Sequence, residues 1–237
     1  MLIEVSALDT LFFRDGKPFS MGENHWTDSI FPPSMSTIYG ALRTAYFSQN
    51  IEVFEKLQAN NELNTDKDPT RKLEIKKLFY RINKSNNAGF YYSMPLDLVS
   101  LKNKSEEEKK YEEKNKKYKV KQLKIRENNY INSNPLKYLL YYDQYIENIT
   151  DGLIDKYRIT DYIKGKAKKI EVCKISDYFL SEPKVGIGID KKIGTSKESR
   201  LYRIDLKRLK DVSLIVEFEG IEIEEKDWPV HHLPEAI

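Results

Sequence analysis

Three segments of this chain alternate apolar and polar residues, and no other feature restricts the possible folds as much. The first segment covers residues 2–8, and the other two cover residues 201–206 and 212–219. A period of two places apolar side chains on one face of a strand and polar side chains on the other. The three segments therefore predict half-buried β-strands.

A helix is predicted after the first strand. Ser34 and Ser36 are both candidate N-caps for a helix that ends near Ser48, and its apolar residues recur at helical spacing. We expect Gly40 to let this helix pack closely against the first strand. Residues 77–82 and 90–94 predict a hairpin.

Strands and helices thus mix without a regular βαβ alternation, which is typical of the α+β class. The expected fold is an antiparallel sheet with packed helices and a long insertion. The first strand, helix and hairpin match most of a ferredoxin-like β-α-β-β-α-β unit.

The insertion covers residues 101–127, where Lys and Glu dominate and apolar residues are few. Such a composition buries too little apolar surface to offset the entropy lost on ordering. We expect a mobile, solvated segment that is dispensable for folding, and we favour a charged surface loop over an RNA-binding arm. The remaining residues, 1–100 and 128–237, are expected to form the folded region.

Composition excludes several classes of protein. The chain has 237 residues, and its 40 Lys and Arg against 37 Asp and Glu give a net charge of +3, so nucleic-acid binding must be argued from local clusters. A single cysteine, Cys173, excludes a disulfide framework and a zinc site built from cysteines. The sequence shows no signal peptide and no apolar run long enough to span a membrane, so we expect a cytoplasmic protein without membrane partners.

A glycine-rich stretch contains Gly186 and Gly188. Lys191 stands where a dinucleotide-binding fingerprint needs its third glycine, no helical pattern follows, and no P-loop is present. Glycines let the backbone approach a phosphate closely, and nearby cations supply charge. The flanking cations are Lys184, Lys191, Lys192, Lys197 and Arg200. A tight turn with solvated lysines explains the pattern equally well.

Histidines offer little support for catalysis. His231 and His232 are adjacent, and no spacing in the chain suggests a metal site, so we expect no metal and no cofactor. His25 lies between Asn24 and Trp26, and its ordinary pKa suits a general base in RNA cleavage. A structural role, holding the loop by hydrogen bonds, is the favoured interpretation of His25.

Several motifs together resemble one protein family. The motifs are residues 8–26 (LDTLFFRDGKPFSMGENHW), 31–43 (FPPSMSTIYGALR), 94–99 (MPLDLV), 182–190 (EPKVGIGID) and 200–202 (RLY). In this order they resemble the third subunit of the Cmr module, the type III-B CRISPR effector complex, within the repeat-associated mysterious protein (RAMP) superfamily. The resemblance covers residues 1–100 and 150–220 and leaves the Lys-rich insertion unmatched.

The resemblance implies ferredoxin-like (RRM-like) domains, usually two, the second of which is expected to be incomplete within these residues. It also implies a non-catalytic subunit in antiviral defence, which binds the 5′ tag of the CRISPR RNA and pairs with the large polymerase-like subunit beside other RAMP subunits. The candidate RNA-binding residues are Gly186, Gly188, Lys191, Lys192, Lys197, Arg200, Arg14 and Lys17.

Two alternatives to this function stay open. The first is a metal-independent RAMP endoribonuclease that uses His25. The second is a purely architectural subunit whose basic loop meets acidic protein instead of RNA.

Overall fold

The chain forms two compact units. The computed structural model describes residues 1–14, 26–84, 87–128, 136–166, 170–189, 196–224 and 231–232. The first unit combines Met1–Tyr80 with Phe179–Ile237, and the second is the continuous segment Arg81–Tyr178. Helices and mostly antiparallel strands mix without βαβ alternation in both units, which confirms the expected α+β class.

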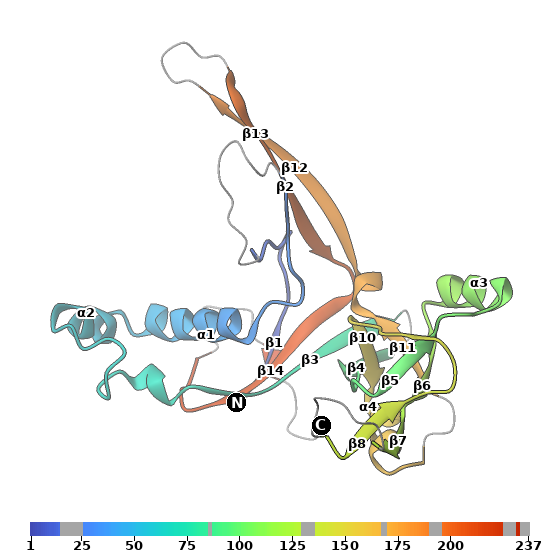
Figure 1. The fold of residues 1–237 in the computed structure, drawn as a ribbon. Helices are drawn as coiled ribbons and strands as arrows, with labels where there is room; N and C mark the ends of the chain where they lie inside the picture. The colour runs from blue at the N-terminus through green and yellow to red at the C-terminus, as the bar shows by residue number, and fades with distance from the viewer. Residues whose placement is uncertain are drawn as a thin grey trace. The chain divides into compact units, whose positions relative to one another are not determined.

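The main sheet of the first unit is built from both ends of the chain. Its strands are β1 (Leu2–Val5), β3 (Glu74–Lys84, which continues into the second unit), β14 (Val212–Glu219) and β15 (His231–His232), in the order β15-β1-β14-β3. β1 lies antiparallel to β14, with Ile3 opposite Val216, and antiparallel to β15. Figure 1 shows β1, β14 and β3 side by side. Strands therefore lie at two of the three predicted segments, residues 2–8 and 212–219, but the expected half-burial was wrong: Glu4 is buried while Val5 is exposed, and Ser213 and Ile215 of β14 are both buried.

Two consecutive helices accompany this sheet: α1 (Met35–Gln49) and α2 (Ile51–Ala59) (Figure 1). The Ser34 side chain caps α1 by accepting a hydrogen bond from the backbone N–H of Thr37. α1 buries Ile38, Leu42 and Phe47. Our expectation for Gly40 was wrong, because Gly40 is exposed and a Cβ there would meet nothing within 4 Å. At 100° per residue, Gly40 lies on the side of the helix opposite Ile38 and Leu42.

A buried carboxylate ties α1 to the short 3-10 helix η1 (Pro69–Lys72). Asp68, only 2% exposed, accepts hydrogen bonds from Arg43 Nη2 (2.7 Å), from the Thr70 hydroxyl (2.6 Å) and from the Asn64 backbone (2.9 Å). Burial raises the pKa of Asp68, but the hydrogen bonds from Thr70 and Asn64 and the Arg43 charge outweigh it, so the pKa lies below its ordinary value. This network fixes the segment that leads into β3.

Within the second unit, the strands of the sheet follow the order β4-β10-β11-β6-β5-β9. The strands are β4 (Asn87–Ser93), β5 (Leu98–Leu101), β6 (Tyr118–Gln122), β9 (Ile146–Glu147), β10 (Gly152–Asp155) and β11 (Ile170–Lys174). Its core contains Leu98, Val120, Ile154, Ile170 and Val172, with helix α4 (Lys156–Ile163) packed against it through Ile159 and Tyr162. The short 3-10 helix η2 (Ile175–Tyr178) ends the unit.

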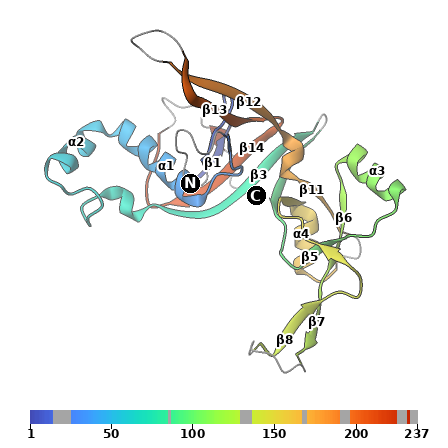
Figure 2. The same ribbon diagram turned by 45° about the horizontal axis from the view of Figure 1, so that its top comes forward.

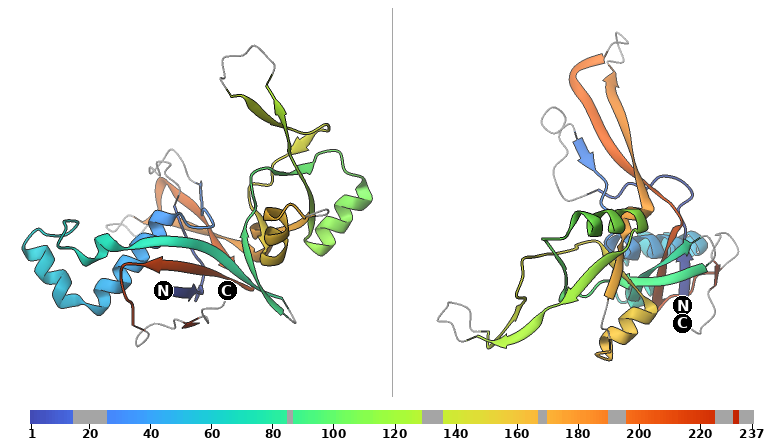
Figure 3. Two further views of the ribbon diagram at one scale, coloured as in Figure 1. Left: turned by 90° about the horizontal axis from the view of Figure 1, so that it is seen from below. Right: turned by 90° about the vertical axis from the view of Figure 1, so that its right-hand side faces the viewer.

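A two-stranded arm and one helix complete the second unit. The arm pairs β7 (Lys124–Glu127) with β8 (Tyr138–Tyr141), and the helix is α3 (Glu106–Asn115). Figure 2 labels them, and Figure 3 shows the arm as a yellow-green hairpin.

No helix among the described residues is long and apolar enough to cross a membrane.

The Lys/Glu-rich segment 101–127 differs from the mobile insertion that we expected. It contains α3, which begins with a capping box between Ser105 and Glu108, and β6, which pairs with both β5 and β11. Val120 is 4% exposed, and Glu112 is buried where Lys104 Nζ donates to its two carboxylate oxygens at 2.8 and 2.7 Å. A single valine between lysines and one buried ion pair are thus enough to build a very polar sequence into a core.

Candidate nucleic-acid interface

The glycine-rich stretch and the N-terminal motif meet on a long hairpin of the first unit. The hairpin pairs β12 (Phe179–Ile189) with β13 (Ser196–Leu209), and β2 (Trp26–Asp28) adds to β13 in parallel (Figure 1). The third predicted strand, 201–206, is therefore confirmed as part of β13. Leu11 and Lys207 exchange two backbone hydrogen bonds of 2.8 Å, so the segment before β2 also runs along β13.

Arg14 lies where the N-terminal segment folds back on itself. It forms an isolated antiparallel bridge with Ser29, whose buried hydroxyl accepts a hydrogen bond from the Phe13 N–H at 2.9 Å. The Ser29 N–H in turn donates to the Asp205 carbonyl at 3.1 Å. The exposed Arg14 is thereby held beside the hairpin. Lys17 and His25 lie outside the described residues.

Gly186 sits opposite Tyr202 in the hairpin, and the tyrosine ring explains the glycine. A Cβ on Gly186 would lie 2.1 Å from Tyr202 Cζ and 2.3 Å from its hydroxyl oxygen. The hydroxyl end of the ring therefore lies across the Gly186 backbone, where any other residue would collide with it. The Tyr202 ring therefore covers the backbone of Gly186 on that face of the sheet.

Gly188 lies at the one place where the hairpin register shifts, between Ile187 and Ile189. β12 continues past it to Ile189, which pairs with Ser196. The backbones of Lys197 and Arg200 belong to β13, but their side chains lie outside what the structure describes. Lys191 and Lys192 are also outside the described residues. The contacts of these four cations therefore stay predictions.

Two arginines on the described part of β13 are neutralised by carboxylates. Arg203 Nε donates to Asp205 at 3.2 Å, and Asp205 is buried. Arg208 donates two hydrogen bonds to Glu182 across the hairpin and also reaches Asp9 at 3.0 Å. The Arg208 hydrogen bond lowers the pKa of Glu182, and the hydrogen bond from the Thr10 backbone, aided by Arg208, lowers the pKa of Asp9. These arginines brace the hairpin, so their charge is largely used internally.

Unlike these arginines, two lysines of the hairpin form no ion pair with the described residues. Lys184 is exposed, lies on the same face as Gly186 two residues further along β12, and forms no ion pair with the described residues. Lys207 donates to the Ser181 hydroxyl at 3.2 Å and lies over the Phe179 ring at 5.2 Å. The described surface thus combines an exposed cation with an aromatic ring on one face of an extended β-ribbon.

This combination suits contact with a single-stranded nucleic acid. Phosphates are attracted by lysines, and unpaired bases stack on aromatic side chains. Within the described ranges, no group of three or more His, Cys, Asp or Glu side chains is placed to hold a metal ion. Sequence reasoning missed Tyr202, because its importance depends on the register that sets it opposite Gly186. Alternation within 201–206 places Tyr202 on one face but does not identify its cross-strand partner.

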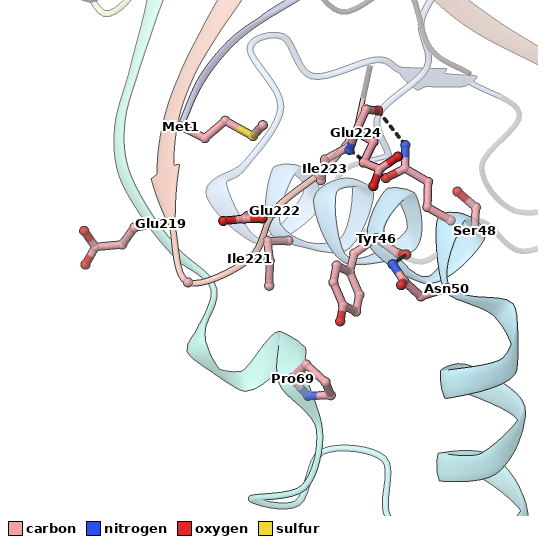
Figure 4. Close-up of a pocket in the computed structure, with 12 residues that line it drawn as sticks. Met1, Tyr46, Ser48, Asn50, Pro69, Glu219, Ile221, Glu222, Ile223 and Glu224 are labelled. Atoms are coloured by element: carbon pink, nitrogen blue, oxygen red, sulfur yellow. Dashed lines mark hydrogen bonds between the residues drawn. The ribbon is translucent and has the colours of Figure 1, made fainter. Parts of the chain in front are cut away.

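A cavity of about 1100 Å³ lies elsewhere in the first unit (Figure 4). It lies between the end of α1 and residues 219–224, where the Gln49 side chain exchanges hydrogen bonds of 2.7 and 2.9 Å with the Glu224 backbone. Glu219, Glu222 and Glu224 line it, so it repels a polyanion. This cavity is therefore a poor candidate for nucleic acid.

Comparison with known proteins identifies the family to which this chain belongs. A family model described as CRISPR-associated protein (Cas_Cmr3) matches residues 3–233. Because the match spans nearly the whole chain, the protein belongs to the Cmr3 family of CRISPR-associated proteins. The family resemblance inferred from the sequence motifs is thereby confirmed. No curated protein sequence matches the chain.

Two solved structures are similar to the chain. One is a chain of the type III-B Cmr-beta complex bound to cognate target RNA and AMPPnP (state 1), with 16% identity and a TM-score of 0.45. The other comes from Cmr-beta bound to cognate target RNA, with 17% identity and a TM-score of 0.40. Each match covers 92% of this chain and 54% of the other. The present chain therefore spans about half the length of these chains.

Proposed function

We propose that the protein is a non-catalytic, RNA-binding subunit of a type III-B CRISPR (Cmr) effector complex in antiviral defence. It holds the 5′ tag of the CRISPR RNA and pairs with the large polymerase-like subunit beside other RAMP subunits. The observation that carries the proposal is the family match over residues 3–233. The hairpin supports it, because β13 lies beside both the N-terminal motif and the glycine-rich motif.

The RAMP ferredoxin-like fold is part of this proposal. In the first unit, the strands taken in chain order are β1, β3, β14 and β15, and their spatial order is β15-β1-β14-β3. A ferredoxin-like sheet has the same order, with its first and third strands in the centre, and β1 pairs antiparallel with both neighbours as that fold requires. On this interpretation, the second unit and the β12–β13 hairpin are insertions between the second and third strands.

RNA binding is tested by filter binding of tag-bearing CRISPR RNA to the protein with its large-subunit partner, across a salt series. We expect replacement of Lys191 and Lys192 by Gln to weaken binding and to flatten the salt dependence by up to about two units of slope. The matched control replaces Lys109 and Lys110, two adjacent lysines on α3, by Gln and should leave both quantities unchanged. Equal affinity and slope in both variants would exclude the hairpin loop as an RNA contact and favour the architectural alternative.

The absence of catalysis is tested separately. Labelled repeat RNA is incubated with the purified protein in the presence of EDTA, and we expect no cleavage. Cleavage at a defined site that is abolished in His25→Ala would overturn the proposal in favour of the metal-independent endoribonuclease.

A further inference from the structure

One aromatic ring lies at the surface of the hairpin. The hydroxyl end of Tyr202 lies over Gly186, and the side chain of Tyr202 remains 41% exposed. An aromatic side chain over a cross-strand glycine is a known device for filling the space that glycine leaves in a sheet. Gly186 supports the ring from below, and strand pairing on both sides of Tyr202 fixes its backbone.

A cation accompanies this ring on the same face. Lys184 and Gly186 alternate along β12, so their positions lie on one side of the sheet, and Lys184 is exposed without an ion pair among the described residues. The negative charges nearby, Glu182 and Asp9, are both engaged by Arg208. Glu182 and Asp9 carry two negative charges against those of Arg208 and Lys184, so the surface around the ring offers a phosphate the exposed Lys184 ammonium group but no net positive charge.

We propose that Tyr202 is a stacking platform for one unpaired base of single-stranded RNA, with Lys184 beside the adjoining phosphate. This inference rests on the proposed function and specifies how the hairpin reads its ligand. Stacking accepts any base, because every base has a π-face, whereas the lysine responds only to the backbone.

The test uses the full chain and an eight-nucleotide single-stranded oligoadenylate that carries 2-aminopurine at each position in turn. We expect quenching on binding at one position with the wild-type chain and with Tyr202→Phe. Tyr202→Leu should abolish this quenching and weaken binding about 5- to 150-fold, which corresponds to the 1–3 kcal/mol measured for base–aromatic stacking. Gly186→Ala should act in the same direction, because the added Cβ displaces the ring.

Two control variants separate stacking from general damage. Gly40→Ala adds the same methyl group where it meets nothing, and Tyr157→Leu removes an 82% exposed tyrosine from the second unit. Both should bind and quench as the wild type does. If Tyr202→Leu fails to fold, an abasic nucleotide at the quenching position must weaken binding to the wild-type chain to a similar extent.

The outcomes distinguish this inference from the proposed function. If the wild-type chain binds with a clear salt dependence but Tyr202→Leu binds and quenches equally, the platform is wrong and RNA binding stands. If an abasic nucleotide at every position leaves the affinity unchanged, the platform is likewise wrong. If the wild-type chain does not bind the oligonucleotide at all, the platform is wrong, whereas the proposed function is decided separately by filter binding of tag-bearing CRISPR RNA to the protein with its large-subunit partner.

Discussion

The two basic regions of the chain, the β12–β13 hairpin and the Lys/Glu-rich segment 101–127, use their charges in opposite ways. In the segment, the ion pair between Lys104 and Glu112 is largely buried, with side-chain exposures of 11% and 7%, and it joins α3 to the rest of the unit. In the hairpin, the ion pairs of Arg208 lie at the surface, the partly exposed Arg203 pairs with the buried Asp205, and Lys184 forms no ion pair with the described residues. The density of lysines in a sequence therefore says little about where a polyanion binds; their partners decide it.

The largest effect on stability is expected when a charge is placed at a buried position of segment 101–127. Val120→Asp puts a carboxylate at a 4% exposed position on β6, so we expect a loss of about 3 kcal/mol or more in the free energy of unfolding. Urea unfolding measures it, with Lys121→Asp at the next, exposed position as the control, expected within about 0.5 kcal/mol. Equal midpoints for both variants would mean that the segment is peripheral after all.

The next test concerns the buried ion pair. Glu112→Gln leaves the Lys104 charge without a partner and should lower the free energy of unfolding by about 2–4 kcal/mol. Adding Lys104→Met removes that charge, while the glutamine still accepts the hydrogen bond that Lys119 N–H gives to Glu112 at 3.1 Å. We therefore expect the double variant to be more stable than Glu112→Gln alone. If the double variant were less stable than Glu112→Gln alone, the unpaired Lys104 charge would not be the cause of the lost stability.

Asp68 provides the corresponding test in the first unit. We expect Asp68→Asn to lower the free energy of unfolding by about 1–3 kcal/mol at pH 7, because Arg43 loses its buried partner. The pKa of Asp68 is lowered from 3.8 in the folded state, so its stabilisation is present above about pH 4 and is lost as the pH falls through the folded value. The difference between wild type and variant should thus narrow from pH 7 to pH 3. A constant difference would contradict the lowered pKa.

Exposed ion pairs should behave differently from these buried ones. We expect Glu182→Gln to leave the melting temperature essentially unchanged, since Arg208 and Glu182 are both solvated and Arg208 keeps Asp9. Removing the Glu182 carboxylate makes the hairpin more positive by one unit of charge, so it should tighten RNA binding slightly and steepen its salt dependence by up to about one unit of slope. Glu108→Gln, which frees Lys119 on the segment, is the matched variant and should not change RNA binding. Identical effects of the two variants on binding would remove the distinction between the regions.

The smallest effect is expected at Gly40. Gly40→Ala adds a methyl group on the exposed side of α1 and should raise the free energy of unfolding by up to about 1 kcal/mol, because alanine favours the helix. Thermal melting measures this change. A destabilised variant would restore our original expectation that Gly40 packs against the first strand. The same variant sets the baseline for Gly186→Ala in the binding assay.

Local patterns in the sequence predicted the elements well and their assembly poorly. Alternation located β14 and β13, and the serine caps and helical spacing located α1, because those signals depend on neighbouring residues. The pairing of β1 with β14 depends on residues more than two hundred positions apart, so nothing local encodes it. The segment 101–127 was misjudged because composition averages over Val120 and Glu112, the two side chains that are buried.

The candidate site shows the same limit. The glycine-rich stretch lies on the β12–β13 hairpin, and it suggested an open backbone at Gly186. The structure places Tyr202 over that backbone, a relation fixed by strand register. The acid partners of Arg203 and Arg208 depend on the same register, which explains why they could not be assigned from spacing.

The discontinuous first unit has a consequence for synthesis. As the chain leaves the ribosome, β1 and α1 must wait for β14, which closes their sheet and lies more than two hundred residues further along the chain. The second unit is continuous, so it has all its residues available first. If it folds in that interval, it shortens the effective loop between β1 and β14 and lowers the entropy lost when they pair. Early folding of the second unit would therefore make it easier for β1 and β14 to pair.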